Sequence, residues 1–124
     1  MPKKILICDD EENVRESIKL ILSYETDFVI IEASNGKDVP AILQNNPDIF
    51  LAILDLKMPG MNGLELLGVI KNGYPKIKVI MVSGYMDDET ESQAYSLGIS
   101  RYITKPFTFN NFIKIFKEVI KDTQ

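Results

Sequence analysis

Short apolar runs alternate with segments of helical periodicity along the whole chain. Five runs are rich in apolar and β-branched residues: Ile5–Cys8, Phe28–Ala33, Ile49–Leu54, Val79–Ser83 and Tyr102–Thr104. In Ile49–Leu54 all six residues are apolar, which is typical of a strand covered on both faces of a parallel sheet. The pattern therefore predicts five short strands.

Between and after these runs, apolar residues recur at the spacing of a helix. The predicted helices are Asn13–Tyr24, Val39–Gln44, 64–72, Asp87–Leu97 and a last one after Thr108. Asn13 and Thr108 are the expected caps of the first and last helices. The fourth helix has few apolar residues, so we expect it to be loosely held or to keep a face free for a partner.

The regular alternation of strands and helices predicts an α/β fold. Right-handed crossovers place helices on both faces of a parallel sheet, which gives a doubly wound, five-stranded sheet flanked by five helices. The strand order 2-1-3-4-5, that of the flavodoxin-like arrangement, fits this pattern. The sequence contains no linker or repeat, so we expect residues 1–124 to form a single domain.

Charged and hydroxyl side chains stand at the downstream ends of four predicted strands. Asp9 and Asp10 follow the first strand, Asp55 the third, Ser83 closes the fourth and Lys105 follows the fifth. Parallel strands bring these ends to one edge of the sheet, where ligands bind in folds of this type. Three carboxylates, a hydroxyl and an ammonium in one place suit a divalent cation and a phosphoryl group.

Simple electrostatics supports the assignment of a cation to this edge. Two carboxylates about 4 Å apart repel each other by roughly 4 kcal/mol at an effective dielectric constant of 20. Mg²⁺ prefers such hard oxygen ligands and takes one or two carboxylates together with phosphate oxygens. Taken singly, however, an acidic doublet is most often a solvated loop, and Asp55, Ser83 and Lys105 could each be an ordinary turn or surface residue.

Composition excludes several classes of function. The chain has no histidine, so a phosphohistidine donor would have to be another molecule. The net charge of −4 argues against nucleic-acid binding by this chain alone. No apolar stretch is long enough to span a membrane, and the single cysteine favours a reducing, cytoplasmic setting. Cys8 lies in an apolar run and is expected to be a small buried residue.

Four motifs give the chain a family resemblance: ICDDE at 7–11, LDLKMPGMNG at 54–63, MVSG at 81–84 and YITKPF at 102–107. With them the chain resembles the response-regulator receiver domain of two-component signalling, which has a chemotaxis-regulator-like fold. The resemblance runs from about Lys3 to Lys121. It implies a phosphoacceptor switch of a signalling phosphorelay rather than an enzyme, with at most self-phosphorylation from small donors and slow self-dephosphorylation.

The resemblance also implies a role for each site residue. Asp55 would accept the phosphoryl group, with Ser83 and Lys105 contacting it. Mg²⁺ would be bound by Asp10 and Asp55, with Asp9 acting through water and the carbonyl of Lys57 completing the site. Tyr102 would be an aromatic switch that alters the surface of the fourth helix, fifth strand and last helix. The Lys105-Pro106 peptide bond is expected to be cis.

The expected partners are a sensor histidine kinase or a histidine phosphotransfer protein, and an output protein or fused effector domain. A phosphorylation-dependent homodimer is compatible with the resemblance. The sequence does not identify the kinase, the pathway or the output, nor whether the domain stands alone or belongs to a longer regulator.

Two other functions fit part of the pattern. A small aspartate-nucleophile phosphatase would use Asp55 and Mg²⁺, but such enzymes place an acid two residues later, where this chain has Lys57. A flavodoxin-like binding module would need a hydroxyl- and glycine-rich phosphate loop after the first strand, where this chain has four acidic residues.

Overall fold

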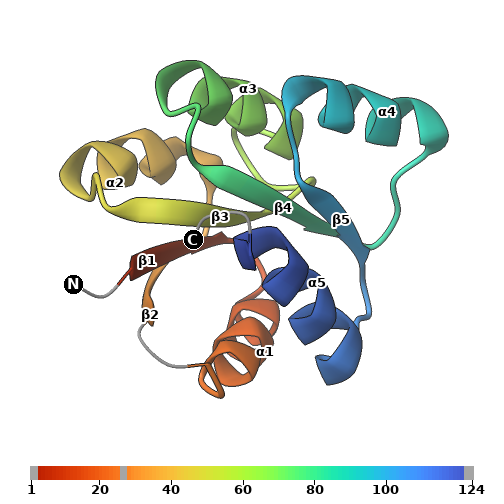
Figure 1. Cartoon of the computed structure of the whole chain (residues 1–124). Coiled ribbons are helices and arrows are strands. Elements are labelled where there is room, and N and C mark those ends of the chain that lie inside the picture. The colour runs from red at the N-terminus through yellow and green to blue at the C-terminus, as the bar shows by residue number, and fades with distance from the viewer. Residues whose placement is uncertain (1–2, 26–27, 122–124) are drawn as a thin grey trace.

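The computed structural model describes residues 3–25 and 28–121, and within them a five-stranded parallel sheet lies between two layers of helices (Figure 1). The strand order is β2-β1-β3-β4-β5, as predicted. The strands are β1 (Lys3–Cys8), β2 (Phe28–Ala33), β3 (Ile49–Asp55), β4 (Lys78–Ser83) and β5 (Arg101–Thr104). The predicted fold class is therefore confirmed.

The helices are divided unequally between the two faces of the sheet (Figure 1). They are α1 (Glu12–Leu22), α2 (Val39–Asn45) preceded by the short 3-10 helix η1 (Gly36–Asp38), α3 (Gly63–Gly73), α4 (Asp88–Leu97) and α5 (Phe109–Lys121). Helices α1 and α5 cover one face, whereas α2, α3 and α4 cover the other. No helix in the described part of the chain is both long enough and apolar enough to cross a membrane.

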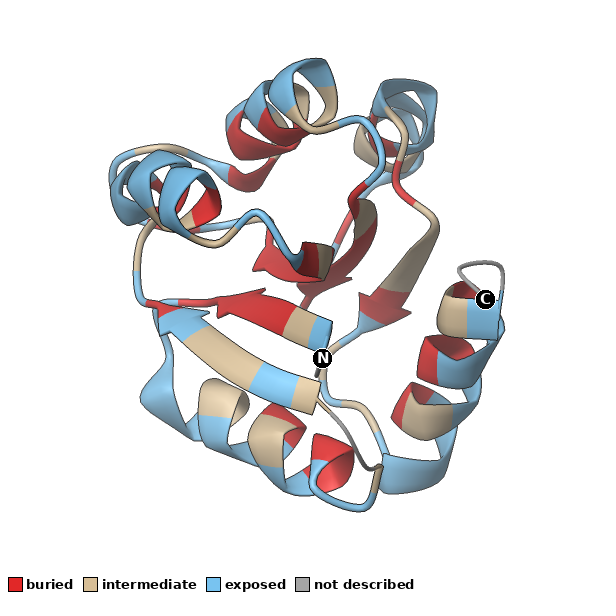
Figure 2. Ribbon diagram, turned by 60° about the vertical axis from the view of Figure 1, so that its left-hand side comes forward, coloured by how far each residue is buried: buried red, intermediate tan, exposed pale blue. Residues whose placement is uncertain are grey.

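Each face of the sheet has its own hydrophobic core. Alternate residues of a strand point to opposite faces, so on β3 Leu54 joins the core under α2, α3 and α4, and Ile53 joins the one under α1 and α5. The central strands β1, β3 and β4 are buried on both sides (Figure 2). This burial explains the uninterrupted apolar runs and holds the carboxyl ends of these strands rigidly in register.

The start of α1 differs from the prediction. Asn13 is not its cap: the helix begins at Glu12, and the preceding Glu11 makes no capping hydrogen bond with its side chain. The turn before the helix is instead fixed by Asp9, whose Oδ1 accepts a hydrogen bond from the backbone N–H of Glu11 at 2.9 Å. The helix also ends at Leu22 rather than Tyr24, and at this end the Ser23 hydroxyl donates to the carbonyl of Leu20.

The other helix starts follow common capping rules. Thr108 accepts a hydrogen bond from the N–H of Asn111 at the start of α5, as predicted. Asn62 caps α3 through the N–H of Glu65, and its own amide donates to the Glu65 carboxylate. This role of Asn62 was not predicted from the sequence. Helix α4 is capped by Asp87 but buries only Ala94, which agrees with its predicted weak attachment.

Candidate phosphoryl and metal site

Asp9 and Asp55 meet because β1 and β3 are neighbours in the sheet. Cys8 pairs with Leu54 in the parallel register, so the next residue of each strand emerges at the same edge. Asp10 follows in the loop, and the carboxylates of all three acids offer oxygens within 4.8 Å of one another. Asp9 and Asp55 are buried, whereas Asp10 is exposed. The predicted convergence of the three acids is thus present in the structure.

Lys105 brings a positive charge to the buried pair of acids. Its Nζ lies 2.9 Å from Asp9 Oδ2 and 3.2 Å from Asp55 Oδ2, and it is 3.9 Å from a carboxylate oxygen of Glu11. The lysine follows β5, two strands away from β3, so the length of its side chain spans the gap. The Lys105-Pro106 bond is cis, as predicted.

The charges in this cluster do not balance. Burial raises the pKa of Asp55, and the nearby negative charge of Asp9 raises it further, although Lys105 acts in the opposite direction. Burial also opposes the charge on Lys105, but its contacts with Asp9 and Asp55 raise its pKa overall. Lys105 is therefore charged, but its single ammonium does not balance the carboxylates of Asp9, Asp10 and Asp55. An additional cation would relieve the remaining repulsion.

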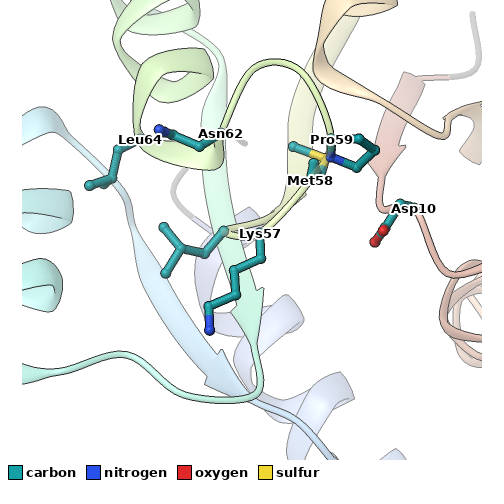
Figure 3. A pocket seen from close by; sticks show the side chains of 7 residues that line it. Asp10, Lys57, Met58, Pro59, Asn62 and Leu64 are labelled. Carbon is teal, nitrogen blue, oxygen red and sulfur yellow. The ribbon is translucent and has the colours of Figure 1, made fainter.

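The donor atoms fit a magnesium ion. Carboxylates and backbone carbonyls are hard oxygen ligands, and an exposed Asp10 leaves one side of the cluster open to water molecules that Mg²⁺ keeps when bound. A hollow of about 570 Å³ lies beside Asp10, lined also by Leu56, Lys57, Met58, Pro59, Asn62 and Leu64 (Figure 3). The cluster thus has the ligand chemistry for such an ion, and the hollow adjoins it at Asp10.

The loop after β3 is held close to Asp55 by Gly63. Its N–H donates to the carbonyl of Leu56 at 2.8 Å, and a Cβ at this position would lie 2.5 Å from the carbonyl oxygen of Asp55. Only glycine allows this approach. Within the loop, the N–H of Lys57 donates to Asp55 Oδ1 at 3.3 Å, while the Lys57 side chain is exposed.

Ser83 and Tyr102 lie on the neighbouring strands β4 and β5, where the register pairs Ser83 with Thr104 and Tyr102 with Met81. Ser83 is buried, and its hydroxyl donates to the carbonyl of Tyr85 at 3.3 Å. Tyr102 is half-buried, and its hydroxyl donates to the backbone carbonyl of Ser83 at 3.4 Å. A movement of the Ser83 backbone would therefore change the support of the Tyr102 ring.

Cys8 is buried, as predicted, and has no access to solvent. Its sulfur lies 3.3 Å from the sulfur of Met58. Burial raises the pKa of the thiol to about 12, and the charges of Asp9 and Asp55 act in the same direction. A thiol in this state is unreactive, so Cys8 serves packing beneath the acids.

Arg15 also contacts the site and was not among the residues predicted from the sequence. From α1 its guanidinium donates to the backbone carbonyl of Asp9 at 2.7 Å and to Glu32 of β2 at 3.0 Å. A signal was present: Glu32 is the one charged residue in the apolar run Phe28–Ala33. Glu32 is exposed on β2, where a basic residue of the neighbouring helix α1 can pair with it.

Comparisons with known proteins identify the family to which the chain belongs. A family model described as the response regulator receiver domain matches residues 5–117. The chain belongs to this family. Receiver domains are the phosphoacceptor switches of response regulators, so the receiver is not an enzyme of the ordinary kind, and neither the phosphatase nor the flavodoxin-like alternative is supported.

Curated relatives agree with this family. Response regulator RR06 of Streptococcus pneumoniae is 38% identical over 117 residues, which cover 94% of this chain and 52% of the relative. Response regulator protein VraR of Staphylococcus saprophyticus is 36% identical over 107 residues, 85% of this chain and 50% of the relative. The receiver chain thus spans about half the length of these relatives.

Solved structures share the fold over nearly the whole receiver. A CheY-like response regulator receiver domain protein of Methanospirillum hungatei has a TM-score of 0.90 at 32% identity. The match covers 98% of this chain and 96% of the Methanospirillum chain. A CheX-CheY-BeF3-Mg+2 complex from Borrelia burgdorferi has a TM-score of 0.89 at 26% identity, with coverage of 97% and 90%. The second contains magnesium, which agrees with the donor set found here.

Proposed function

We propose that Asp55 of this receiver accepts a phosphoryl group from a phosphohistidine on a sensor histidine kinase or a histidine phosphotransfer protein. The observation that supports it best is the position of the Asp55 carboxylate, buried at a strand end with Asp9 and Asp10 within 4.8 Å and Lys105 at 3.2 Å. The chain itself contains no histidine, so the phosphohistidine of the donor lies outside these 124 residues.

In the proposed reaction, an Asp55 oxygen attacks phosphorus, the phosphorus–nitrogen bond of the donor breaks, and the released imidazole takes up a proton. Asp9, Asp10, Asp55 and the carbonyl of Lys57 would hold Mg²⁺, which when bound supplies positive charge to the transferring phosphoryl oxygens. Lys105 already lies beside Asp55 and would pair with the phosphoryl group. Positioning and charge are enough for this reaction, so no histidine base is needed.

The donor needs a surface that leads to Asp55. A groove of about 590 Å³ between α1 and the start of α5 is bounded at one end by Glu11 and Lys105. Its apolar walls include Leu20 and Phe109, whose side chains are 64% and 42% exposed. This groove would seat an apolar helix face of the donor and place its phosphohistidine beside Lys105.

Ser83 and Tyr102 would carry the signal away from Asp55. In the proposed switch the Ser83 hydroxyl exchanges the Tyr85 carbonyl for a phosphoryl oxygen, and the shift alters the contact between the Ser83 carbonyl and Tyr102. A single charge-assisted hydrogen bond contributes about 1.5–3 kcal/mol, whereas a complete population shift needs about 5.5 kcal/mol. Lys105 and the bound cation must therefore contribute to the switch as well.

The output surface would be formed by α4, β5 and α5. Helix α4 has a single buried residue and exposes Tyr95 and Leu97, so it can move or bind a partner at low cost. We assign residues 1–124 to one receiver domain that acts in the cytoplasm on an output protein, on a fused effector domain or through a homodimer.

Intact-mass analysis after incubation with acetyl phosphate and Mg²⁺ tests this function. We expect one added phosphoryl group on the wild-type chain and none on Asp55→Asn or without Mg²⁺. Asp48→Asn changes the same residue type far from the site, so it should be modified like the wild type. Modification of Asp55→Asn to the wild-type extent would refute the assignment of Asp55.

A further inference from the structure

Arg15 holds the main chain of the acidic loop in place. Its Nη1 donates to the carbonyl oxygen of Asp9 at 2.7 Å, and its Nε donates to Glu32 Oε1 at 3.0 Å. The Arg15 side chain is only 15% exposed. One guanidinium therefore links α1, β2 and the loop that carries the acids. Arginine can do this because its planar group presents several donors in a fixed geometry.

The bond to the Asp9 carbonyl reaches Asp10 through the backbone. The carbonyl of Asp9 and the N–H of Asp10 belong to one planar peptide group. A hydrogen bond that holds the Asp9 carbonyl oxygen therefore also fixes the orientation of the peptide plane that contains the Asp10 nitrogen. On its other side, the N–H of Asp9 donates to the carbonyl of Ala33 at 3.1 Å. Both peptide groups of Asp9 are thus anchored to β2, one directly and one through Arg15 and Glu32.

Asp10 has little else to hold it. It is exposed, unlike Asp9 and Asp55. Among the described residues, no side-chain hydrogen bond or ion pair of Asp10 is found, whereas Asp9 contacts Lys105 and the N–H of Glu11. Its place within 4.8 Å of the other two carboxylates therefore depends on the direction of the main chain.

Glu32 is well suited to anchor Arg15. It accepts hydrogen bonds from both Arg15 and Lys19, and Lys19 also pairs with Glu16. The hydrogen bond from Lys19 lowers the pKa of Glu32, burial opposes the shift, and Arg15 lowers the pKa further. The anchor is thus ionised at neutral pH.

We propose that Arg15, held by Glu32, is a positioning residue that orients Asp10 toward Asp9 and Asp55 for magnesium binding. The proposal rests on the proposed function, because it assumes that the three acids bind Mg²⁺. It assigns to Arg15 no contact with the ion or the phosphoryl group.

Charge and position predict opposite effects of removing Arg15. If Arg15 acted only by its charge, its loss would strengthen Mg²⁺ binding, because a nearby cation repels the ion. If it acts by position, Arg15→Met and Arg15→Lys should both weaken binding, although lysine keeps the charge. Loss of a residue that orients a metal ligand typically costs at least about tenfold in affinity, and we expect about that change for both variants.

Calorimetric titration of Mg²⁺ into the wild type, Arg15→Lys, Arg15→Met and Lys19→Gln tests the proposal. Lys19→Gln is the matched control, because it removes one positive charge from Glu32 without touching Asp9. We expect the wild-type affinity for Lys19→Gln. Phosphorylation by acetyl phosphate is measured in parallel over a range of Mg²⁺ concentrations. We expect the Arg15 variants to need about tenfold more Mg²⁺ but to reach the wild-type rate at saturation.

The possible failures can be told apart. If the wild type binds Mg²⁺ and the Arg15 variants bind it equally well or more tightly, the positioning role is refuted while the proposed function stands. Equal weakening by Lys19→Gln, or a reduced rate at saturating Mg²⁺, would indicate general damage to the fold and would also overturn the role. If the wild type does not bind Mg²⁺, the proposed function itself fails, and the role of Arg15 fails with it.

Discussion

At Asp55 the requirements of folding conflict with those of the proposed function. Its carboxylate is buried beside Asp9, and both features raise its pKa. A group whose pKa is higher in the folded than in the unfolded state stabilises the fold below the unfolded pKa, and this contribution is lost as pH rises through the folded pKa. At neutral pH the ionised Asp55 therefore lowers the stability of the metal-free protein.

Removing the Asp55 charge should stabilise the metal-free protein. Without Mg²⁺ at pH 7, Asp55→Asn should melt a few degrees above the wild type, because the amide keeps the shape of the side chain and removes the buried charge. Asp10→Asn is the control; it removes an exposed charge and should change the melting temperature less. Calorimetric melting at pH 7 and again at acidic pH checks both the effect and its sign.

Two changes of conditions should reduce the stabilisation by Asp55→Asn. The gain from Asp55→Asn should shrink as pH falls toward the unfolded pKa of aspartate, where the wild-type carboxylate is protonated. It should also shrink when Mg²⁺ is added. A gain that is independent of both pH and Mg²⁺ would mean that Asp55 is not electrostatically strained.

The sequence predicted the residues of the site better than the contacts between them. Asp9, Asp55 and Lys105 could be found because each stands at a strand end, and strand ends follow from apolar runs. Arg15 could not be found by that rule, because it lies inside a helix and contacts a backbone oxygen. The hydrogen bond from the Ser83 hydroxyl to the Tyr85 carbonyl was equally hidden, since it depends on the path of one turn.

At the scale of elements, α3 and α4 begin in the same way but are attached to the sheet very differently. Asn62 and Asp87 each accept a hydrogen bond from the N–H three residues later. Helix α3 buries Gly63, Leu66, Leu67 and Ile70, whereas α4 buries only Ala94. The Asn62 cap should therefore contribute to the global stability of the domain, whereas the Asp87 cap should contribute only to the local stability of α4.

Replacing each cap by alanine should reveal this difference. Asn62→Ala should lower the free energy of unfolding of the whole domain by about 1 kcal/mol, the usual cost of a lost cap. Asp87→Ala should leave global unfolding nearly unchanged and should accelerate amide hydrogen exchange within α4. Denaturant unfolding and residue-resolved exchange distinguish the two. Equal loss of global stability in both variants would show that α4 unfolds only together with the sheet.

Element boundaries were the least accurate part of the prediction. The strands were correct to within two residues, because both faces of the sheet are buried and the apolar runs end where burial ends. The start of α1 was wrong because a side chain outside the helix, that of Asp9, fixes the preceding turn. Periodicity within a helix does not report such a contact.

At the scale of the whole molecule, the sheet separates two hydrophobic cores, and no side chain of residues 3–25 and 28–121 belongs to both. Ile70 of α3 lies in one core and Ile18 of α1 in the other. Removing one methylene group from either should cost about 0.5–1.5 kcal/mol. Effects at sites without shared partners add.

The double variant Ile18→Val and Ile70→Val should therefore lose the sum of the two single losses, to within about 0.5 kcal/mol. Urea unfolding of the four proteins forms the required cycle. Ile70→Val combined with Leu67→Val, two neighbours in one core, serves as the comparison and need not be additive. A large coupling between Ile18 and Ile70 would show that the two cores adjust to each other through the strands.

Gly63 limits how far this domain could be redesigned. The walls of the hollow beside Asp10, such as Leu56 and Leu64, could be exchanged to admit bulkier small-molecule donors. Any side chain at residue 63 would instead collide with the main chain of Asp55 and Leu56. An engineered library should therefore vary the residues that line the hollow and keep glycine at position 63. A larger residue there would displace Asp55 before any new specificity could arise.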